Sequence, residues 1–360
     1  MSLRFGSAEE AGLSRDELIT AYELLLSGLD EDAYAGAVCL VARHGVIAGF
    51  WALGWRRLQE PAAAMTHDAI FDLASLTKAI VTAPVILRLR SEGKLSLEDP
   101  LCRHLPWTEG SFAGEAKLID LLTHRGGLPP TADIGWAKEP RQRHSELLAA
   151  IGTEPRTGGV YSDLGYYLLG CVAEAAGGEP LPRLFGRVVQ GPLGLFGSGY
   201  GPRDAGRQPI VASEERPEGL LEGVVHDGKA RLMGGIAGHA GLFAPALDVA
   251  LFGQAVLDGG MGRFGTMLPK AEAALLLAPH TAPPDPRGLG FFEWGERDGN
   301  DFFFPAWGHT GYTGTSFAIA PKTGLLVVLL TNRVHPVRRP EERLKSVRSR
   351  FHRAVWHSQI

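Results

Sequence analysis

The sequence contains little cysteine, with only Cys39, Cys102 and Cys171 among 360 residues. All three lie in apolar segments and their number is odd, so we expect reduced, buried thiols and no disulfide framework. A catalytic cysteine is the alternative, and it would need surroundings that stabilise a thiolate.

Long hydrophobic runs are also missing. No stretch approaches the roughly 18 consecutive apolar residues that a membrane-spanning helix needs. The start, MSLRFGSAEEAGLS, carries charges where a signal peptide would have its apolar centre. We therefore expect a cytoplasmic protein, although a leader removed ahead of this start would leave the same pattern.

No block of like charges is present either. The formal net charge is -4 with 21% charged residues, and no basic arm or acidic tail stands out. This balance argues against a nucleic-acid partner. The 45% of hydrophobic residues is enough for a large globular core. The oligomeric state stays open.

Strand patterns occur near both ends of the chain, and helical patterns dominate the middle. The start of the first helix is marked by Ser14 with Glu17 three places on, a capping box. Strands are expected at 35–42, 46–55, 301–308, 315–320 and 325–334, with residues 43–45 turning the first two into a hairpin. Helices are expected at 76–92, 116–124, 164–176, 246–258 and 341–357. Since an isolated hairpin is marginal in water, strands from both ends should join one antiparallel sheet. The predicted fold class is α+β, with residues 1–80 and 290–360 forming an α/β sandwich and 81–289 a mostly helical insert.

The segment FDLASLTKAI places Ser75 and Lys78 three residues apart at the start of an apolar helix. Residues i and i+3 share one helical face, so the two side chains should lie together. An unpaired buried ammonium is costly, which predicts a lowered pKa for Lys78 and a role as proton acceptor from Ser75. The alternative is a capping serine with a lysine that reaches the surface. Pro84 should interrupt the helix near residue 80, because proline has no N–H.

A second pair with the same spacing, Ser91 and Lys94, is not expected to form a catalytic site. Gly93 between them is typical of a helix end, so the two side chains would not share a face. A Lys-Thr-Gly triplet at 322–324 follows Pro321 and reads as a hairpin turn.

Two further polar clusters accompany Ser75. Tyr161 follows a glycine-rich turn, precedes an apolar helix and has Asp163 two residues on. His309 and Thr310 end a strand, where Gly311 permits close approach of a ligand to the backbone. A packing role for Tyr161 is the alternative, as for most tyrosines.

Taken in order, these motifs resemble those of the penicillin-recognising serine hydrolases. They are Ser75-Leu-Thr-Lys78, Tyr161-Ser-Asp163 and His309-Thr-Gly311. The segments LLTHRGGLPP at 121–130 and VHDGKARLMGGIAGHAGLF at 225–243 are similar to the class C β-lactamase branch, which includes β-lactamases, D-alanyl-D-alanine carboxypeptidases and esterases. The resemblance runs from about residue 10 to 335 and implies the same fold as the strand and helix patterns.

The resemblance also implies roles. Ser75 would be the nucleophile that forms an acyl-enzyme, and Lys78 and Tyr161 would share the general acid and base work. Backbone N–H groups of Ser75 and Tyr312 would form the oxyanion hole.

The substrate side of the site departs from the commonest pattern at two positions. His309, Thr310 and Gly311 would face the substrate, but many family members have lysine where this chain has His309. A neutral histidine should attract a substrate carboxylate less strongly. Asp163 stands where many have asparagine, which puts recognition of an acylamide group in doubt. Asp163 is alternatively a partner for Lys78.

These departures favour a carboxylesterase acting on small esters, with a small-molecule ester or amide as partner and no cofactor. D-alanyl-D-alanine carboxypeptidase and β-lactamase are the alternatives. The acidic loop that positions the deacylating water in class A β-lactamases is not evident. A non-catalytic binding protein of the same fold is the alternative of another class.

A metal site is the remaining alternative, because His226, Asp227 and His239 lie close in sequence and His124 is in a glycine-rich segment. No metal-binding spacing of histidines or cysteines occurs. We expect these histidines to make hydrogen bonds in loops or at helix ends, and no metal to be bound.

Overall fold

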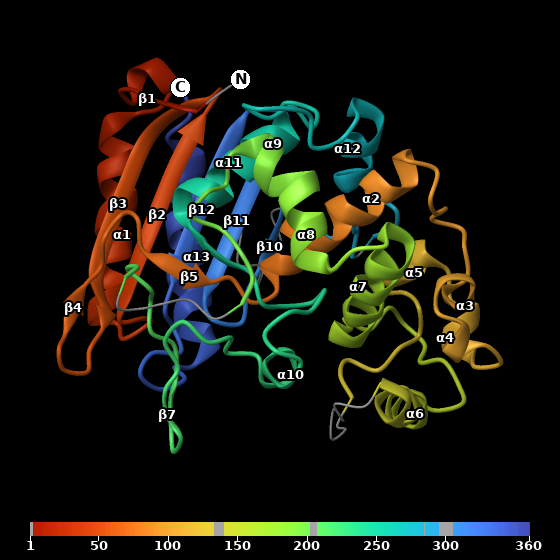
Figure 1. Ribbon diagram of the computed structural model, residues 1–360. Coiled ribbons are helices and arrows are strands. Elements are labelled where there is room, and N and C mark those ends of the chain that lie inside the picture. Colours follow the sequence, from red (N-terminus) through yellow and green to blue (C-terminus); the bar gives the residue numbers. More distant parts are fainter. Residues whose placement is uncertain (1–2, 133–139, 202–206, 284, 295–304) are drawn as a thin grey trace.

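Strands from both ends of the chain form a single sheet. The computed structural model describes residues 3–132, 140–201, 207–283, 285–294 and 305–360. Within them an eight-stranded sheet has the order β1-β3-β2-β12-β11-β10-β9, with β4 paired to β3 (Figure 1). Its strands are β1 (Arg4–Phe5), β2 (Gly36–Arg43), β3 (Val46–Arg57), β4 (Ala63–Ala64), β9 (Phe292–Trp294), β10 (Ala306–Thr310), β11 (Thr315–Ala320) and β12 (Leu325–Thr331). Residues 301–304 of one expected strand lie outside the described residues.

The expected hairpins are present. β2 and β3 pair antiparallel through a turn in which His44 and Gly45 have φ values of 51° and 79°. β12 then pairs with β2 and joins the N-terminal strands to the C-terminal ones. One expectation was wrong: β1 runs parallel to β3, so the sheet is mixed. The chain passes through helix α1 (Arg15–Asp30) and β2 between these two strands, so no tight turn forces them to be antiparallel.

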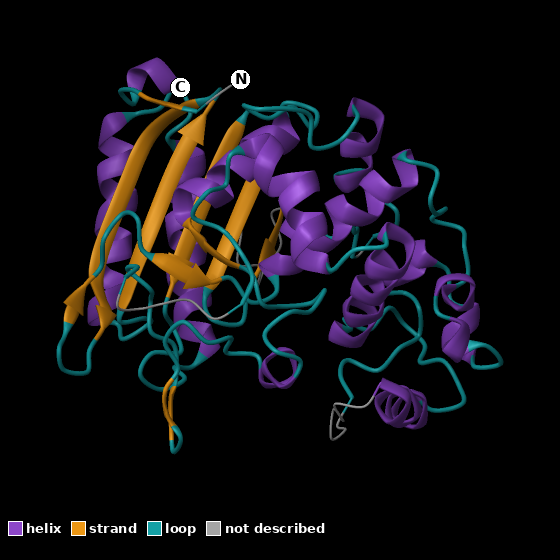
Figure 2. Ribbon diagram, in the orientation of Figure 1, coloured by secondary structure: helices purple, strands orange, loops and turns teal. Residues whose placement is uncertain are grey.

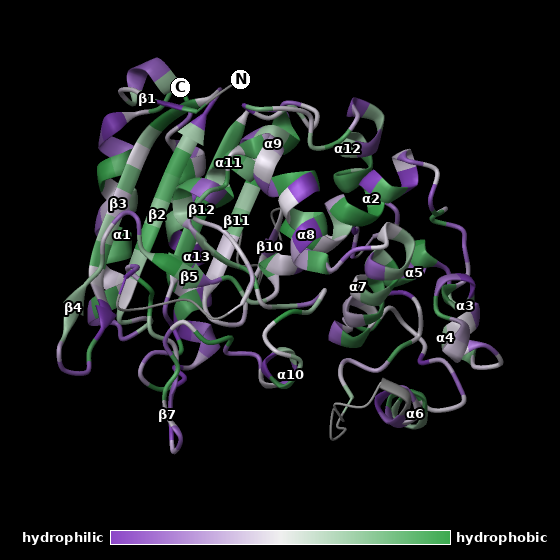
Figure 3. Cartoon of the chain, in the orientation of Figure 1, coloured by the Kyte–Doolittle hydropathy of each residue, from purple (hydrophilic) through white to green (hydrophobic). Residues whose placement is uncertain are grey.

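The middle of the sheet is buried on both faces. Along β2, Ala37, Cys39 and Val41 belong to one core cluster, whereas alternate residues face another. Helices α1 (Arg15–Asp30) and α13 (Glu341–His357) cover the first face, and α11 (Ala246–Leu257) packs on the other. Figure 3 shows the resulting pattern, with β2 and β3 mostly hydrophobic and α1 carrying both kinds of residue.

The capping box predicted for the first helix is confirmed on its serine side. Ser14 is the N-cap of α1, and its hydroxyl accepts a hydrogen bond from the Glu17 N–H at 3.4 Å. The closing helix α13 has the bounds that the sequence indicated.

Beside the sheet lies a region of short helices and loops (Figure 2). Its helical elements are η2 (Lys78–Thr82), α2 (Ala83–Ser91), α3 (Leu101–His104), η3 (Pro106–Thr108), α4 (Phe112–Glu115), α5 (Leu118–Leu122), α6 (Pro140–Ile151), α7 (Asp163–Gly177), α8 (Leu181–Phe185), η4 (Gly186–Gln190), α9 (Gly191–Leu193), α10 (Gly228–Leu232) and α12 (Lys270–Leu276). A short 3₁₀ turn, η1 (Glu9–Ala11), precedes α1. Two small ribbons, β5 (Ile70–Asp72) with β8 (Phe243–Pro245) and β6 (Glu215–Arg216) with β7 (Gly219–Leu220), complete the fold.

The helix interruption expected at Pro84 is present. Residues 78–82 form a π-helical turn, in which the Ala83 N–H donates to the Lys78 carbonyl, and α2 follows. Pro84 has no N–H to donate, and the wider π-helical turn ahead of it accommodates this interruption of the α-helical hydrogen bonds.

The cysteines are unpaired, as expected. Cys39 is buried, whereas Cys102 and Cys171 are only partly buried, so the expectation of burial holds fully for one of them. Burial raises the pKa of Cys39, and raises that of Cys171 to about 11. Neither is an activated thiolate.

Among the helices in the described residues, none combines the length and the apolar character that crossing a bilayer requires.

Candidate active site

Ser75 lies on a tight turn at the start of the helical segment that continues into η2. The residue before it, Ala74, has a φ of 48°, a left-handed conformation that is uncommon outside glycine. Its N–H donates to the Asp72 carboxylate at 2.9 Å, which holds the turn. Ser75 is left partly exposed to a pocket.

Lys78 lies next to Ser75, as the spacing predicted, and is fully buried. Its ammonium donates to Ser75 Oγ at 2.9 Å, to Asp163 Oδ1 at 2.7 Å and to the His239 carbonyl at 3.1 Å. An ammonium has three protons to donate, so all of them are engaged. Asp163 is therefore a partner of Lys78, and the alternative of a lysine that reaches the surface is wrong.

The lowered pKa expected for Lys78 is also wrong. Burial by itself would lower the pKa, but the opposing charges of Tyr161 and Asp163 outweigh it and raise the pKa above its ordinary value. The sequence argument treated the ammonium as unpaired, whereas the fold provides it with an anionic partner. Lys78 is thus a cation at neutral pH.

Tyr161 closes the other side of this cluster. Its ring centroid lies 5.0 Å from Lys78 Nζ, and its hydroxyl interacts with both Lys78 and Ser75. Burial raises the pKa of the phenol, while the Lys78 charge acts to lower it. The helix that follows, α7, is capped by Ser162, whose hydroxyl accepts from the Gly165 N–H at 3.1 Å.

His124 supports Tyr161 from behind. Its Nδ1 accepts a hydrogen bond from the Ser162 N–H at 3.0 Å, and its ring centroid lies 4.3 Å from that of Tyr161. Burial lowers the pKa of His124 well below its usual value, so the ring is neutral. The expected hydrogen-bonding role of His124 is confirmed.

His309 lies on β10 and is neutral. Its Nδ1 is 2.7 Å from the Thr310 carbonyl, which can only accept, so the proton resides on Nδ1. Burial, aided by the Lys78 charge, lowers the pKa to about 3. Nε2 has no hydrogen-bond partner among the described residues. His309 cannot serve as a cationic anchor for a carboxylate.

The segment from Gly311 to Thr315 packs directly on the turn that carries Ser75. A Cβ on Gly311 would lie 2.6 Å from the Leu73 carbonyl, so only glycine allows this approach. The Thr315 hydroxyl donates to the same carbonyl at 3.0 Å. Within the described part of the chain, the N–H groups of Ser75 and Tyr312 donate no hydrogen bond, so both are free for an oxyanion.

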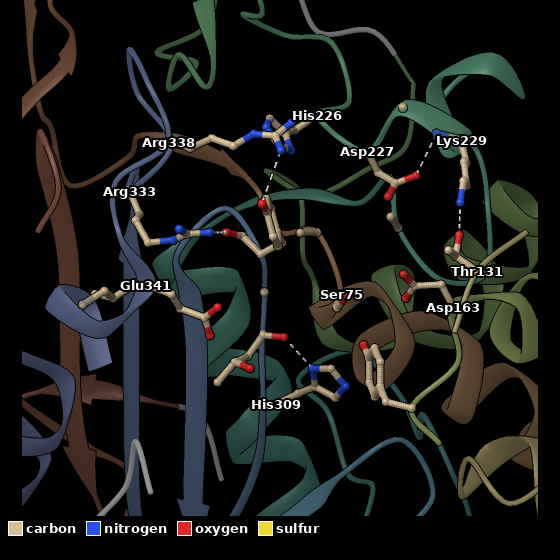
Figure 4. Close-up of a pocket in the computed structure, with 18 of the residues that line it drawn as sticks. Ser75, Thr131, Asp163, His226, Asp227, Lys229, His309, Arg333, Arg338 and Glu341 are labelled. Carbon is tan, nitrogen blue, oxygen red and sulfur yellow. Dashed lines mark hydrogen bonds between the residues drawn. The ribbon is translucent and has the colours of Figure 1, made fainter. Parts of the chain in front are cut away.

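These side chains line a cavity of about 760 Å³ (Figure 4). It brings together the residues that the sequence singled out, with Lys78 buried behind Ser75. The residues in question are Ser75, Tyr161, Asp163, His309, Thr310, Gly311 and Tyr312.

The same cavity contains cationic residues that the sequence analysis missed. Six of its lining residues are arginine or lysine and three are aspartate or glutamate. Arg333 and Arg338 lie with their guanidinium carbons 4.9 and 5.6 Å from the centre of the Tyr312 ring. No sequence motif indicated that these arginines belong to the site, because they follow β12 and come from a part of the chain far from Ser75. The sequence shows three arginines at 333, 338 and 339, but not what they face.

The residues considered for a metal site have other partners. His226 Nε2 lies 3.1 Å from Glu214, and His239 Nε2 lies 3.2 Å from Asp227. Asp227 also caps α10 by accepting from the N–H of Ala230. In the described ranges, no group of three His, Cys, Asp or Glu side chains is arranged to hold a metal ion.

The other two motif matches have the structural roles expected of them. The triplet 322–324 forms the turn between β11 and β12, away from the cavity. Ser91 ends α2 and donates to the Arg88 carbonyl, while Lys94 pairs with Glu92 beyond Gly93.

Replacing Asp163 with asparagine tests the pairing with Lys78. The variant lacks the negative charge of Asp163, which counteracts the effect of burial on Lys78. The pKa of Lys78 should therefore fall, and any rising limb of the pH–activity profile should move to lower pH. The free energy of unfolding at pH 7 should fall by about 1–3 kcal/mol, less than for a fully buried pair because the Asp163 side chain is 35% exposed. Activity profiles and urea unfolding measure the two effects.

Asp68→Asn is the matched control, since Asp68 is exposed on the same segment of the chain as Ser75. The pKa of Asp163 is lowered in the fold, so the stability that it contributes is present at neutral pH and is lost as pH falls through that lowered pKa. The difference between wild type and Asp163→Asn should therefore vanish in strong acid. An equal difference at all pH values would contradict the pairing.

Comparison with known proteins places this geometry in context. The family model described as Beta-lactamase matches residues 23–350. An N-acetylmuramyl-L-alanine amidase from Bacillus subtilis (strain 168) is 35% identical, covering 86% of this chain and 80% of its own. A class C β-lactamase from Rhodobacter sphaeroides superimposes with a TM-score of 0.76 at 21% identity, covering 94% and 98% of the two chains. A β-lactamase/D-alanine carboxypeptidase from Pseudomonas syringae gives a TM-score of 0.76 at 17% identity, covering 94% and 99%.

Proposed function

Because the chain belongs to the β-lactamase family and is a serine hydrolase of that fold, we propose that it hydrolyses small esters or amides that carry a carboxylate, through an acyl-enzyme on Ser75. The observation that carries this proposal is the pair of guanidinium groups of Arg333 and Arg338 beside Tyr312, within the cavity that contains Ser75.

Acylation begins with attack of Ser75 Oγ on the substrate carbonyl. The hydroxyl proton passes to the Lys78–Tyr161 pair after the pair has released one proton, since both groups have raised pKa values. The carbonyl oxygen becomes an oxyanion that accepts hydrogen bonds from the N–H groups of Ser75 and Tyr312. Collapse breaks the bond to the leaving group, which takes the proton back from the pair.

Deacylation repeats these steps with water. The pair takes a proton from the water as its oxygen attacks the acyl carbonyl, and the new tetrahedral intermediate expels Ser75 Oγ. Oγ recovers the proton, and the carboxylic acid leaves. No group other than these side chains and backbone amides is needed for the proton balance.

The proposed preference for a carboxylate departs from the sequence-based argument, which favoured a carboxylesterase for small esters because of His309 and Asp163. His309 is neutral and cannot hold a carboxylate, but the cavity offers other cations. Arg333 has no carboxylate partner among the described residues, and donates to the carbonyls of Arg339 and Tyr312. Its charge, with the excess of cationic residues around Tyr312, favours an anionic substrate. The names of the similar proteins, an amidase and a D-alanine carboxypeptidase, accord with substrates of this kind.

A panel of short-chain p-nitrophenyl esters, nitrocefin and a D-Ala-D-Ala peptide tests which bond is cleaved, with Ser75→Ala as the blank. Ester hydrolysis alone would favour the carboxylesterase activity expected from the sequence. Release of D-alanine would favour a carboxypeptidase, and ring opening of nitrocefin a β-lactamase. No Ser75-dependent hydrolysis of any member would contradict the proposal.

Arg338→Gln tests recognition of the carboxylate. Its side chain is 48% exposed and pairs with Glu214 at 2.8 Å, so the fold should tolerate the change. With an S-acyl thioglycolate, KM should rise about tenfold, corresponding to a charge-assisted hydrogen bond. With the methyl ester of the same thioester, KM should stay within about twofold. Thiol release measures both rates.

Lys322→Gln is the control for this change, because it also removes one positive charge but lies in the β11–β12 turn. It should leave both substrates unaffected. If Arg338→Gln changed the charged and the neutral thioester equally, the arginine would not select a carboxylate.

A further inference from the structure

The carboxylate of Asp72 joins two segments on opposite sides of the proposed oxyanion hole. Asp72 ends β5 and is only 5% exposed. One oxygen accepts the Ala74 N–H at 2.9 Å, and the other accepts the His226 N–H at 2.7 Å. Ala74 directly precedes Ser75, and the His226 ring stacks on Tyr312 with centroids 5.7 Å apart. A single buried side chain thus contacts the neighbours of both backbone donors.

The main chain at the same place is tied to the Tyr312 loop. The Thr313 hydroxyl donates to the Asp72 carbonyl at 2.8 Å, and the Thr315 hydroxyl donates to the Leu73 carbonyl at 3.0 Å. Leu73 in turn donates to the Leu242 carbonyl. These hydrogen bonds tie the segment ahead of Ser75 both to the Tyr312 loop and to the chain at Leu242.

We propose that Asp72 is a positioning residue that sets the relative position of the Ser75 and Tyr312 N–H groups, and hence the geometry of the oxyanion hole. This inference rests on the proposed function, since it assigns those two groups to the oxyanion. An ionised carboxylate is suited to the task, because both of its oxygens accept. A protonated acid or an amide offers a donor toward one of the two N–H groups and cannot hold both.

The surroundings make this role sensitive to pH. Burial raises the pKa of Asp72 to about 6, against the lowering effect of its two N–H donors. The charged groups that face it are Asp227, which acts to raise the pKa, and Arg231, which acts to lower it. His226 is neutral above about pH 4, since burial lowers its pKa to about that value. Asp72 is ionised at pH 7 and becomes protonated as the pH falls through 6.

Asp72→Asn is the test, with Asp68→Asn as the matched control. In the asparagine variant kcat for a p-nitrophenyl ester should fall by about 10- to 100-fold, because misplacing one catalytic donor has effects of this size. KM should stay within about twofold. Wild-type kcat/KM should fall more steeply below about pH 6, in addition to the fall that protonation of the Lys78–Tyr161 pair causes, whereas Asp72→Asn should lack this additional acid limb. A role in stability alone would not remove the limb.

Circular dichroism establishes whether the variant folds. Should Asp72→Asn be unfolded, the pH profile of wild type is the remaining test, because protonation of Asp72 in the folded enzyme leaves one of the two N–H groups without its acceptor. A folded Asp72→Asn with kcat within twofold of wild type and an unchanged acid limb would overturn the inference, as would a wild-type profile without that limb. Loss of activity in Ser75→Ala, measured alongside, shows that such a result refutes the role of Asp72 and not the proposed function.

Discussion

Ser75→Ala should abolish hydrolysis of p-nitrophenyl esters, with a fall of at least about 10³-fold to the background rate. Ser75 Oγ accepts a hydrogen bond from Lys78 Nζ at 2.9 Å and is partly exposed to the cavity. Removing it leaves no atom to form the acyl-enzyme, so binding and the oxyanion donors alone remain. Initial rates of p-nitrophenol release, corrected for spontaneous hydrolysis, measure the effect.

Ser91→Ala is the control, because Ser91 belongs to the other serine–lysine pair with the same spacing. It should leave the rate unchanged. Incubation with a fluorophosphonate followed by mass spectrometry should give one adduct, on Ser75, in wild type and in the control. An adduct elsewhere, or activity in Ser75→Ala, would defeat the assignment.

Lys78→Ala should lower the same activity by at least about 100-fold. In the proposed mechanism the amine is one half of the pair that accepts the Ser75 proton, and proton transfer of this kind contributes 10²- to 10⁴-fold. The change also leaves Asp163 without its cation, so the free energy of unfolding should fall. Steady-state kinetics and thermal unfolding separate the two effects.

Lys94→Ala is the matched control, since Lys94 forms the second pair with Ser91 and interacts only with Glu92 among its charged neighbours in the described residues. It should retain wild-type activity. If Lys78→Ala were folded and retained more than about a tenth of the activity, Lys78 would not take part in proton transfer.

The N-terminal part of the fold illustrates which elements could be predicted from residues that are neighbours in the sequence. The β-forming residues of β2, the capping Ser14 and the turn at Gly45 are features of neighbouring residues, and the corresponding elements are present. The parallel β1 was not predictable, because its partner is chosen by the route of the chain through α1. That strands from both ends share a sheet was expected from the argument that hairpins are unstable alone, but the particular pairing of β2 with β12 was not predicted.

The features of the site likewise divide into those set by neighbouring residues and those set by tertiary packing. The spacing of Ser75 and Lys78 gave their contact, since helical geometry fixes it. The pKa of Lys78 was predicted in the wrong direction, because Asp163 approaches from α7 and its distance depends on tertiary packing. The arginines around Tyr312 were missed for the same reason, since nothing near them in sequence indicates a cavity.

The sequence by itself determined the α+β class, many of the strands and helices and the candidate nucleophile with its neighbours, because those follow from hydrophobic periodicity, turn residues and motif spacing. The tertiary structure alone decided the charge of the lysine, the cationic lining of the cavity and the ties of Asp72 to both sides of it. Electrostatic energies depend on the distance between charges and on their burial, and both quantities exist only once distant segments have packed together.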